Sequence, residues 1–140
     1  MKYDQSFCKA VGEWGCYALC IVDIAEKVLD IHLDKLNCIE LGIKKGYISW
    51  NEDNYMDPKN FDVLRPDKFL GMMTGATWSV RREDDITYQH APDEYIVEKW
   101  ERNGYGHFAR TKDGYNSLQD SKCVNQGKLA SLRVFKMVAA

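Results

Sequence analysis

Two residues far apart in the chain could form a nucleophile–base pair. Cys16 follows Gly15 at the point where an apolar helical pattern begins. The first turn of a helix favours a thiolate, and its backbone N–H groups can also stabilise an oxyanion. His107 opens a predicted strand directly after a turn at residues 103–106. We therefore predict Cys16 as a nucleophile and His107 as its general base.

The other cysteines and histidines lack these surroundings. Cys20 and Cys38 fall inside predicted helices, whereas Cys8 and Cys123 have no helix start beside them. His32 ends the first predicted helix, which it should cap, and His90 precedes Ala91-Pro92 in an expected exposed loop. The plainer alternative is that Cys16 is a small buried apolar residue and His107 a satisfied surface residue.

A third group should orient the imidazole and fix its tautomer. The segment 115–120 follows the histidine strand and should lie antiparallel to it. Asn116 is the first choice for this role and Asp120 the second.

Four residues next to the pair could line a substrate cleft. Gly15 and Gly106 would leave room for a substrate backbone, and Trp14 and Tyr105 would border the cleft. Both aromatic residues could equally be core or rim packing.

Neither a metal nor a cofactor is predicted. Cys16 and Cys20 lie one helical turn apart, but a zinc site needs about four close ligands and no second pair is present. The acidic segment 52–57 does not have the spacing of an EF-hand and is predicted to be a solvated loop. Five cysteines at irregular spacing suit reduced thiols better than disulfides.

The elements that must position these residues divide into two halves. Glycines at 12 and 15 should break the backbone before a helix that begins near Cys16, and further helices are predicted at 34–46 and 66–73. Strands are predicted at 77–81, 95–102, 106–111 and 129–137, forming an antiparallel meander. We predict an α+β fold in a single domain, 1–140, with N-terminal helices (about 1–75) packed on a C-terminal antiparallel sheet (about 76–140).

Composition excludes some classes of function. The 140 residues carry a net charge of −2, without the basic excess that a nucleic-acid binder needs. The longest apolar stretch, residues 16–25, is interrupted by Asp23 and is far shorter than the about 20 residues of a membrane span. The first residues are polar and do not form an export signal, so we expect a cytoplasmic protein.

The order of the motifs resembles that of papain-like cysteine peptidases. Residues 14–19, Trp-Gly-Cys-Tyr-Ala-Leu, resemble their nucleophile helix. Gly106-His107-Phe108 and the segment 115–117 resemble their His and Asn strands. The small size is similar to that of the bacteriocin-leader-processing branch. With the closing segment 127–135, Gly-Lys-Leu-Ala-Ser-Leu-Arg-Val-Phe, the whole chain resembles a group of small uncharacterised proteins carried by bacteriophages and plasmids.

This resemblance implies a papain-like fold and a cysteine peptidase or other amide-bond hydrolase with a peptide or protein substrate. A phage-encoded enzyme would act in the host cytoplasm. One departure concerns the oxyanion glutamine that such enzymes carry about six residues before the cysteine. Ala10 occupies that position here, and Gln5 is the nearest glutamine.

A second hypothesis from another class of function is a non-catalytic mobile-element protein on the same scaffold. It would bind and inhibit a host protein, such as a component of CRISPR or another defence system. The acidic segments 52–57 and 83–85 could face a basic partner, or could be solvated loops.

Overall fold

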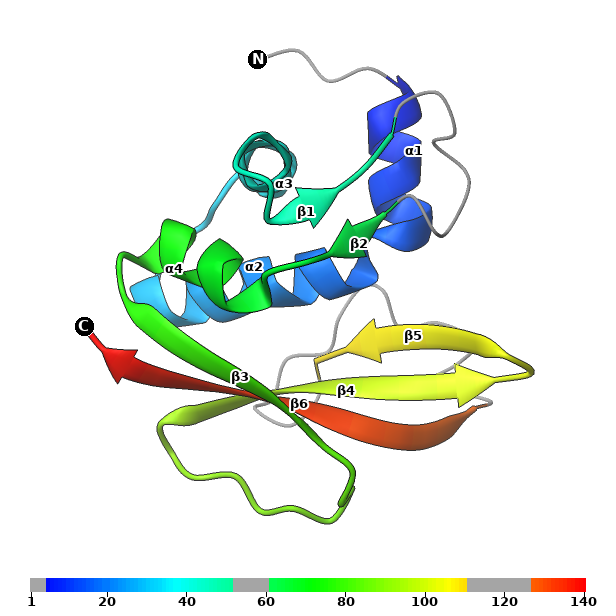
Figure 1. Ribbon diagram of the computed structural model, residues 1–140, viewed down its shortest axis with the longest axis vertical. Coiled ribbons are helices and arrows are strands. Elements are labelled where there is room, and N and C mark those ends of the chain that lie inside the picture. Colours follow the sequence, from blue (N-terminus) through cyan, green and yellow to red (C-terminus); the bar gives the residue numbers. More distant parts are fainter. Residues whose placement is uncertain (1–4, 52–60, 111–126) are drawn as a thin grey trace. The chain divides into compact units, whose positions relative to one another are not determined.

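The computed structural model describes residues 5–51, 61–110 and 127–140 (Figure 1). The chain divides into two units, Met1–Gly75 and Ala76–Ala140, at the point where the sequence changes from a helical to a strand pattern. The first unit contains the helices and a two-stranded ribbon, and the second contains a four-stranded antiparallel sheet. These elements confirm the α+β class. The single-domain arrangement stays a prediction.

The helical unit is built around an apolar helix. Its helices are α1 (Gln5–Trp14), α2 (Cys16–Leu29), α3 (Lys35–Lys44) and α4 (Pro66–Thr74). The strands β1 (Ile48–Ser49) and β2 (Asp62–Val63) pair to form the ribbon. The buried positions of α2 are mostly apolar: Ala18, Cys20, Ile21, Val22, Ile24 and Ala25. The predicted helices near 16, 34–46 and 66–73 are confirmed as α2, α3 and α4.

Helix α1 was not predicted, because Gly12 was interpreted as a break. The helix continues through Gly12, and the break is at Gly15 alone. Buried Phe7, Ala10 and Val11 recur at the three- and four-residue spacing of a helical stripe, which is the signal that could have revealed α1.

Gly15 is required by the junction between α1 and α2. Its N–H donates to the Val11 carbonyl oxygen at 2.9 Å, and its own carbonyl accepts from Leu19 N at 2.9 Å. A Cβ atom at Gly15 would lie 2.6 Å from the Val11 oxygen. This neighbour is backbone, so a side chain can be accommodated only if the junction itself shifts.

We expect Gly15→Ala to lower the free energy of unfolding by about 1–3 kcal/mol, the usual cost of overpacking. The matched control is Gly12→Ala, because nothing lies within 4 Å of a Cβ atom at Gly12. That substitution should raise stability by about 0.5–1 kcal/mol, since alanine favours a helix interior over glycine. Urea denaturation of both variants tests the pair, and a Gly15→Ala protein as stable as wild type would contradict the expectation.

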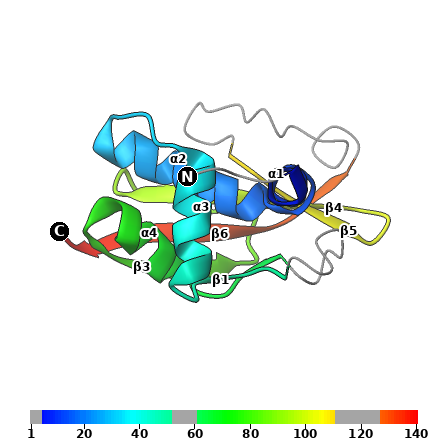
Figure 2. The same ribbon diagram turned by 90° about the horizontal axis from the view of Figure 1, so that it is seen from above.

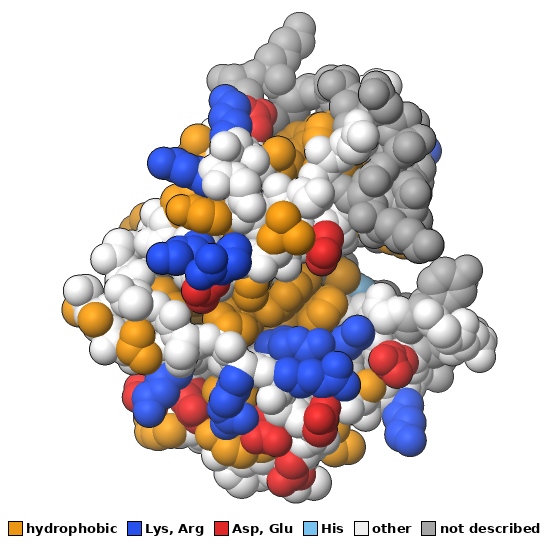
Figure 3. Space-filling model, in the orientation of Figure 1, with side chains coloured by type: hydrophobic (Ala, Val, Ile, Leu, Met, Phe, Trp, Pro, Cys, Tyr) orange, Lys and Arg blue, Asp and Glu red, His pale blue; other side chains and the backbone are white. Residues whose placement is uncertain are grey.

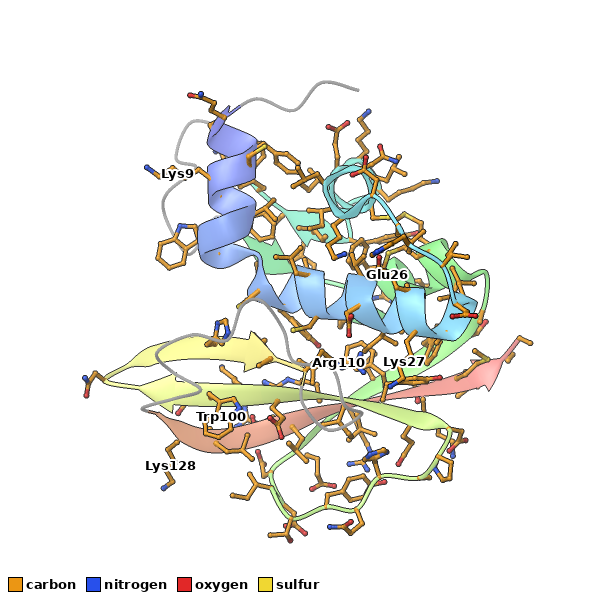
Figure 4. The ribbon with its side chains drawn as sticks, turned by 180° about the vertical axis from the view of Figure 1, so that it is seen from behind. Lys9, Glu26, Lys27, Trp100, Arg110 and Lys128 are labelled. Atoms are coloured by element: carbon orange, nitrogen blue, oxygen red, sulfur yellow. The ribbon has the colours of Figure 1, made fainter. Side chains whose placement is uncertain are left out.

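Glu26 holds the connection between α2 and α3 (Figure 4). Its carboxylate accepts from Leu33 N at 2.9 Å and from Lys35 Nζ at 3.2 Å, and lies 3.1 Å from His32 Nδ1. Burial acts to raise the pKa of Glu26, but these three contacts outweigh it and lower the pKa. His32 therefore contacts Glu26 rather than capping α2, which corrects the prediction.

Helix α3 then runs across α2 (Figure 2). Asp34 caps its N-terminus as predicted, because its side chain accepts from Asn37 N at 3.0 Å. Gly46 follows the helix with a φ of 80°, a conformation that glycine adopts readily.

The sheet unit contains four antiparallel strands in the order β3-β6-β4-β5 (Figure 1). They are β3 (Thr77–Glu83), β4 (Glu94–Arg102), β5 (Tyr105–Ala109) and β6 (Lys128–Ala139). The predicted meander is therefore wrong, because the last strand lies between β3 and β4. Consecutive residues of β6, Ser131 with Leu132 and Val134 with Phe135, are buried, and a strand buried on both faces suits a central position.

The turn between β4 and β5 is the predicted one. Asn103 and Gly104 have φ values of 49° and 83°, as a two-residue hairpin turn requires. The pairing of Trp100 with His107 and of Lys99 with Phe108 follows from this register.

The connection between β3 and β4 is fastened to one face of the sheet. Tyr88 packs against the buried cluster of Ile96, Leu132 and Val134. Its hydroxyl donates to Glu94 Oε1 at 2.7 Å, and Ala91 N donates to the same oxygen at 2.8 Å. The hydrogen bond from Ala91 is the main cause of a lowered pKa of Glu94.

Among the described residues, no helix is long and apolar enough to cross a membrane.

Candidate functional site

Cys16 is the first residue of α2 and is partly exposed. The predicted helix start is thus confirmed for the proposed nucleophile. Gly15, the residue before it, is buried in the α1–α2 junction. The close approach of the Val11 backbone explains why residue 15 is a glycine. A role of Gly15 in substrate binding stays a prediction.

The other described cysteines have different surroundings. Cys20 and Cys38 are buried, and Cys8 is exposed on the surface of α1. Burial raises the pKa of the Cys38 thiol, and the negative charges of Asp34 and Glu26 raise it further. Among the residues that the structure places, Cys16 is therefore the only cysteine at the first position of a helix.

His107 lies in the middle of β5 and is partly buried. Its cross-strand neighbour is Trp100, whose side chain projects from β4 (Figure 4). Trp100 Nε1 donates to Glu98 Oε1 at 3.3 Å, and Glu98 is only 4% exposed. Because residues 98 and 100 alternate onto the same face of β4, a buried carboxylate and an indole share the face of His107.

The sequence interpretation missed Glu98 and Trp100. The alternation of residues 94–100 gives the faces of the strand, but only the β4–β5 register places Trp100 beside His107.

The space beside Gly106 is occupied. A Cβ atom there would lie 3.1 Å from Cε of Lys99, which is near the end of a flexible side chain. A small shift of that lysine would relieve the contact, so packing does not require glycine at residue 106, and its substrate contact stays a prediction.

The remaining predicted site residues are only partly described. Trp14 is the half-buried last residue of α1, and the side chain of Tyr105 lies outside the described residues. Asn116 and Asp120 also lie outside them. Cys16 lies in the helical unit and His107 lies in the sheet unit. The pairing of the two side chains stays a prediction.

Ala10, at the position of the expected oxyanion glutamine, is fully buried in α1. It has no side-chain donor. Gln5, the nearest glutamine, is exposed at the first position of α1.

The acidic segment 83–85 is largely paired with nearby side chains. Glu83 Oε1 lies 2.6 Å from Arg81 Nη1, and Asp84 Oδ1 lies 2.7 Å from Arg82 Nε. Asp85 accepts from the hydroxyl of Thr87. These pairs reduce the charge available to a basic partner. The segment 52–57 lies outside the described residues.

No group of three or more His, Cys, Asp or Glu side chains in the described ranges is arranged to hold a metal ion.

By its fold, the protein is an α+β protein, and one of its cysteines is the first residue of a helix. Residues 1–137 match the family described as "Protein of unknown function, DUF261", and the chain belongs to this family. Neither the curated proteins nor the solved structures contain a match to the chain.

Proposed function

We propose that the protein is a papain-like cysteine peptidase or related amide-bond hydrolase with Cys16 and His107 as its reacting pair. The observation that supports this most directly is the position of Cys16. It is a partly exposed thiol at the first residue of a 14-residue helix, where the helix dipole favours negative charge on sulfur.

The proposed reaction proceeds through an acyl-enzyme. The Cys16 sulfur attacks the carbonyl carbon of a peptide or isopeptide bond, and His107 accepts the thiol proton. His107 then gives that proton to the leaving amine as the C–N bond breaks. Water, deprotonated by His107, releases the acid and restores the thiol. Asn116 or Asp120 would orient the imidazole, and no cofactor takes part.

Ala10 cannot donate a hydrogen bond from its side chain. The oxyanion would therefore be stabilised by backbone N–H groups at the start of α2. Trp14, Gly15, Tyr105 and Gly106 would line the substrate cleft. The resemblance to phage- and plasmid-borne proteins supports a peptide or protein substrate in the host cytoplasm.

Selective alkylation tests this proposal without knowledge of a substrate. The folded protein is treated with iodoacetamide at pH 6, and each cysteine peptide is quantified by mass spectrometry. We expect Cys16 to react at least about ten times faster than the exposed Cys8, because a thiolate is the reactive form. Cys38 should react more slowly than Cys8, because burial raises the pKa of its thiol. A Cys16 that reacts no faster than Cys8 would contradict the proposal.

A second candidate is the non-catalytic inhibitor of a host protein, such as a CRISPR or other defence component. The apolar Ala10 at the glutamine position favours it, because loss of one oxyanion donor costs about a hundredfold or more in rate. An inhibitor should keep its stoichiometric host partner after Cys16→Ala, and loss of the partner in that variant would exclude it.

A further inference from the structure

A buried hydrogen-bond donor lies two residues before the proposed nucleophile. Trp14 Nε1 is buried, and among the described residues no acceptor lies within hydrogen-bond distance of it. An indole N–H is a donor only, so the group that satisfies it must be an acceptor. A buried donor without an acceptor costs free energy, which a ligand with a suitably placed oxygen atom would recover.

The junction of two helices places this donor beside Cys16. Helix α1 ends at Trp14 and α2 begins at Cys16, with Gly15 alone between them. The two helices meet at a sharp bend (Figure 1). Because a single residue separates them, the Cα atoms of Trp14 and Cys16 can be at most about 7 Å apart. Both side chains can therefore reach one bound group.

The packing of α1 positions the indole. Trp14 continues the apolar stripe that Phe7, Ala10 and Val11 form at helical spacing. A side chain in a helix leans over the preceding turn, so the indole should lie over Ala10. Ala10 is fully buried, and its small side chain leaves room for a ring at residue 14. A donor held in this way is preorganised, because it need not be reoriented when an acceptor arrives.

We propose that Trp14 is a catalytic residue whose indole N–H stabilises the oxyanion formed at Cys16. This inference rests on the proposed function. The Cys16 sulfur adds to a carbonyl carbon, and an electron pair of the C=O bond moves to the oxygen. Trp14 Nε1 donates to this oxygen together with a backbone N–H of α2. The C=O bond then re-forms as the leaving group departs with its electron pair.

The hydrogen bond from Trp14 should be strongest in the transition state, because a negative oxygen is a better acceptor than a neutral carbonyl. Trp14 as a whole is only half-buried, so part of its side chain is accessible to a substrate. A bound acyl group must displace the atoms that cover Nε1, and the oxyanion then meets the donor away from bulk water. Exclusion of water strengthens such a contact.

Two reactions of Cys16 distinguish an oxyanion donor from a residue that affects only the thiol. p-Nitrophenyl acetate transfers its acetyl group to sulfur through a tetrahedral oxyanion and releases p-nitrophenolate. Iodoacetamide alkylates the same sulfur by displacing iodide, without forming an oxyanion. Both rates are measured on the full chain at pH 6, with Cys16→Ala as the blank. Figure 3 shows Lys, Arg, Asp and Glu side chains intermingled on the face turned to the viewer, so neutral probes avoid attraction by either sign of charge.

We expect Trp14→Phe to slow acetylation at least about tenfold and alkylation less than about twofold, because phenylalanine keeps an aromatic ring and removes the N–H. The matched control is Trp50→Phe. Trp50 Nε1 is also buried without an acceptor in the part of the chain that the structure places, and its ring packs edge-on against Phe7 with centroids 5.3 Å apart. Trp50 follows β1 and is not adjacent to Cys16 in the chain, so this variant should change either rate less than about twofold.

Equal acetylation rates of wild type and Trp14→Phe would overturn the proposal, as would an equal loss in Trp50→Phe. An equal fall in acetylation and alkylation would also overturn it, because Trp14 would then act on the ionisation of the thiol. A wild-type Cys16 that is alkylated no faster than Cys8 would contradict the reacting pair, whereas the ratio of the two rates still tests Trp14. Thermal melts check that each variant folds. If Trp14→Phe is unstable, β-(3-benzothienyl)alanine at residue 14 replaces only the N–H with sulfur, and its two rates decide the same question.

Discussion

Replacing His107 with alanine should slow the alkylation of Cys16 at pH 6 by about a hundredfold. A free cysteine with a pKa of about 8.5 is only about 0.3% thiolate at this pH. In the proposed pair the imidazole accepts the thiol proton, and the resulting imidazolium stabilises the thiolate. Without His107, only the helix dipole would favour the thiolate, and its contribution is smaller.

The measurement is the second-order rate constant of Cys16 with iodoacetamide between pH 5 and 9. The wild-type rate should stay high below pH 7, whereas the rate of His107→Ala should rise only at higher pH, toward the range in which a free thiol with a pKa of about 8.5 ionises. His90→Ala is the matched control, because His90 lies in the β3–β4 connection with its Nδ1 3.0 Å from the Ala91 carbonyl oxygen. Identical profiles for wild type and His107→Ala would remove His107 from the site.

Phe69→Ala should lower the free energy of unfolding by about 3–5 kcal/mol. Phe69 is fully buried in α4. A Cβ atom at Gly42 of α3 would lie 2.9 Å from the Phe69 ring and 2.9 Å from Ile48 Cδ1. Helices α3 and α4 and strand β1 therefore pack so closely around residue 42 that a side chain larger than that of glycine must displace its neighbours.

This close packing predicts a coupling that a double-mutant cycle can measure. Gly42→Ala alone should destabilise the protein by about 1–3 kcal/mol, because the new methyl group must displace two packed side chains. In a Phe69→Leu background the same change should cost less, since leucine leaves space beside residue 42. Urea denaturation gives the four stabilities.

The control cycle combines Phe69→Leu with Gly12→Ala, whose methyl group meets nothing within 4 Å. Its effects should add. Additive effects in the Gly42 cycle would mean that the Phe69 ring does not limit the space at residue 42.

Local sequence signals predicted most of the helical elements. The spacing of apolar residues located α2, Asp34 marked the start of α3, and Pro66 marked the start of α4. Helix α1 was missed because Gly12 is an unfavourable residue inside a helix. The strands β1 and β2 have two residues each and exist through pairing across a long connection, which no local pattern indicates.

The order of the sheet could not be predicted for a similar reason. Alternation located β3, and turn signals helped to locate β4 and β6, but the pairing of β6 with both β3 and β4 joins residues far apart in the chain. The helix start at Cys16 was predictable, since it depends on neighbouring residues alone.

The central position of β6 has a consequence for synthesis. A chain emerging from the ribosome presents β3, β4 and β5 before the strand that must lie between β3 and β4. The hairpin of β4 and β5 can form early, but β3 has no neighbour in the sheet until residues 128–139 leave the exit tunnel. Any nascent chain that stops short of Lys128 therefore exposes apolar strand faces, and the sheet is complete only after residues 128–139 have been synthesised.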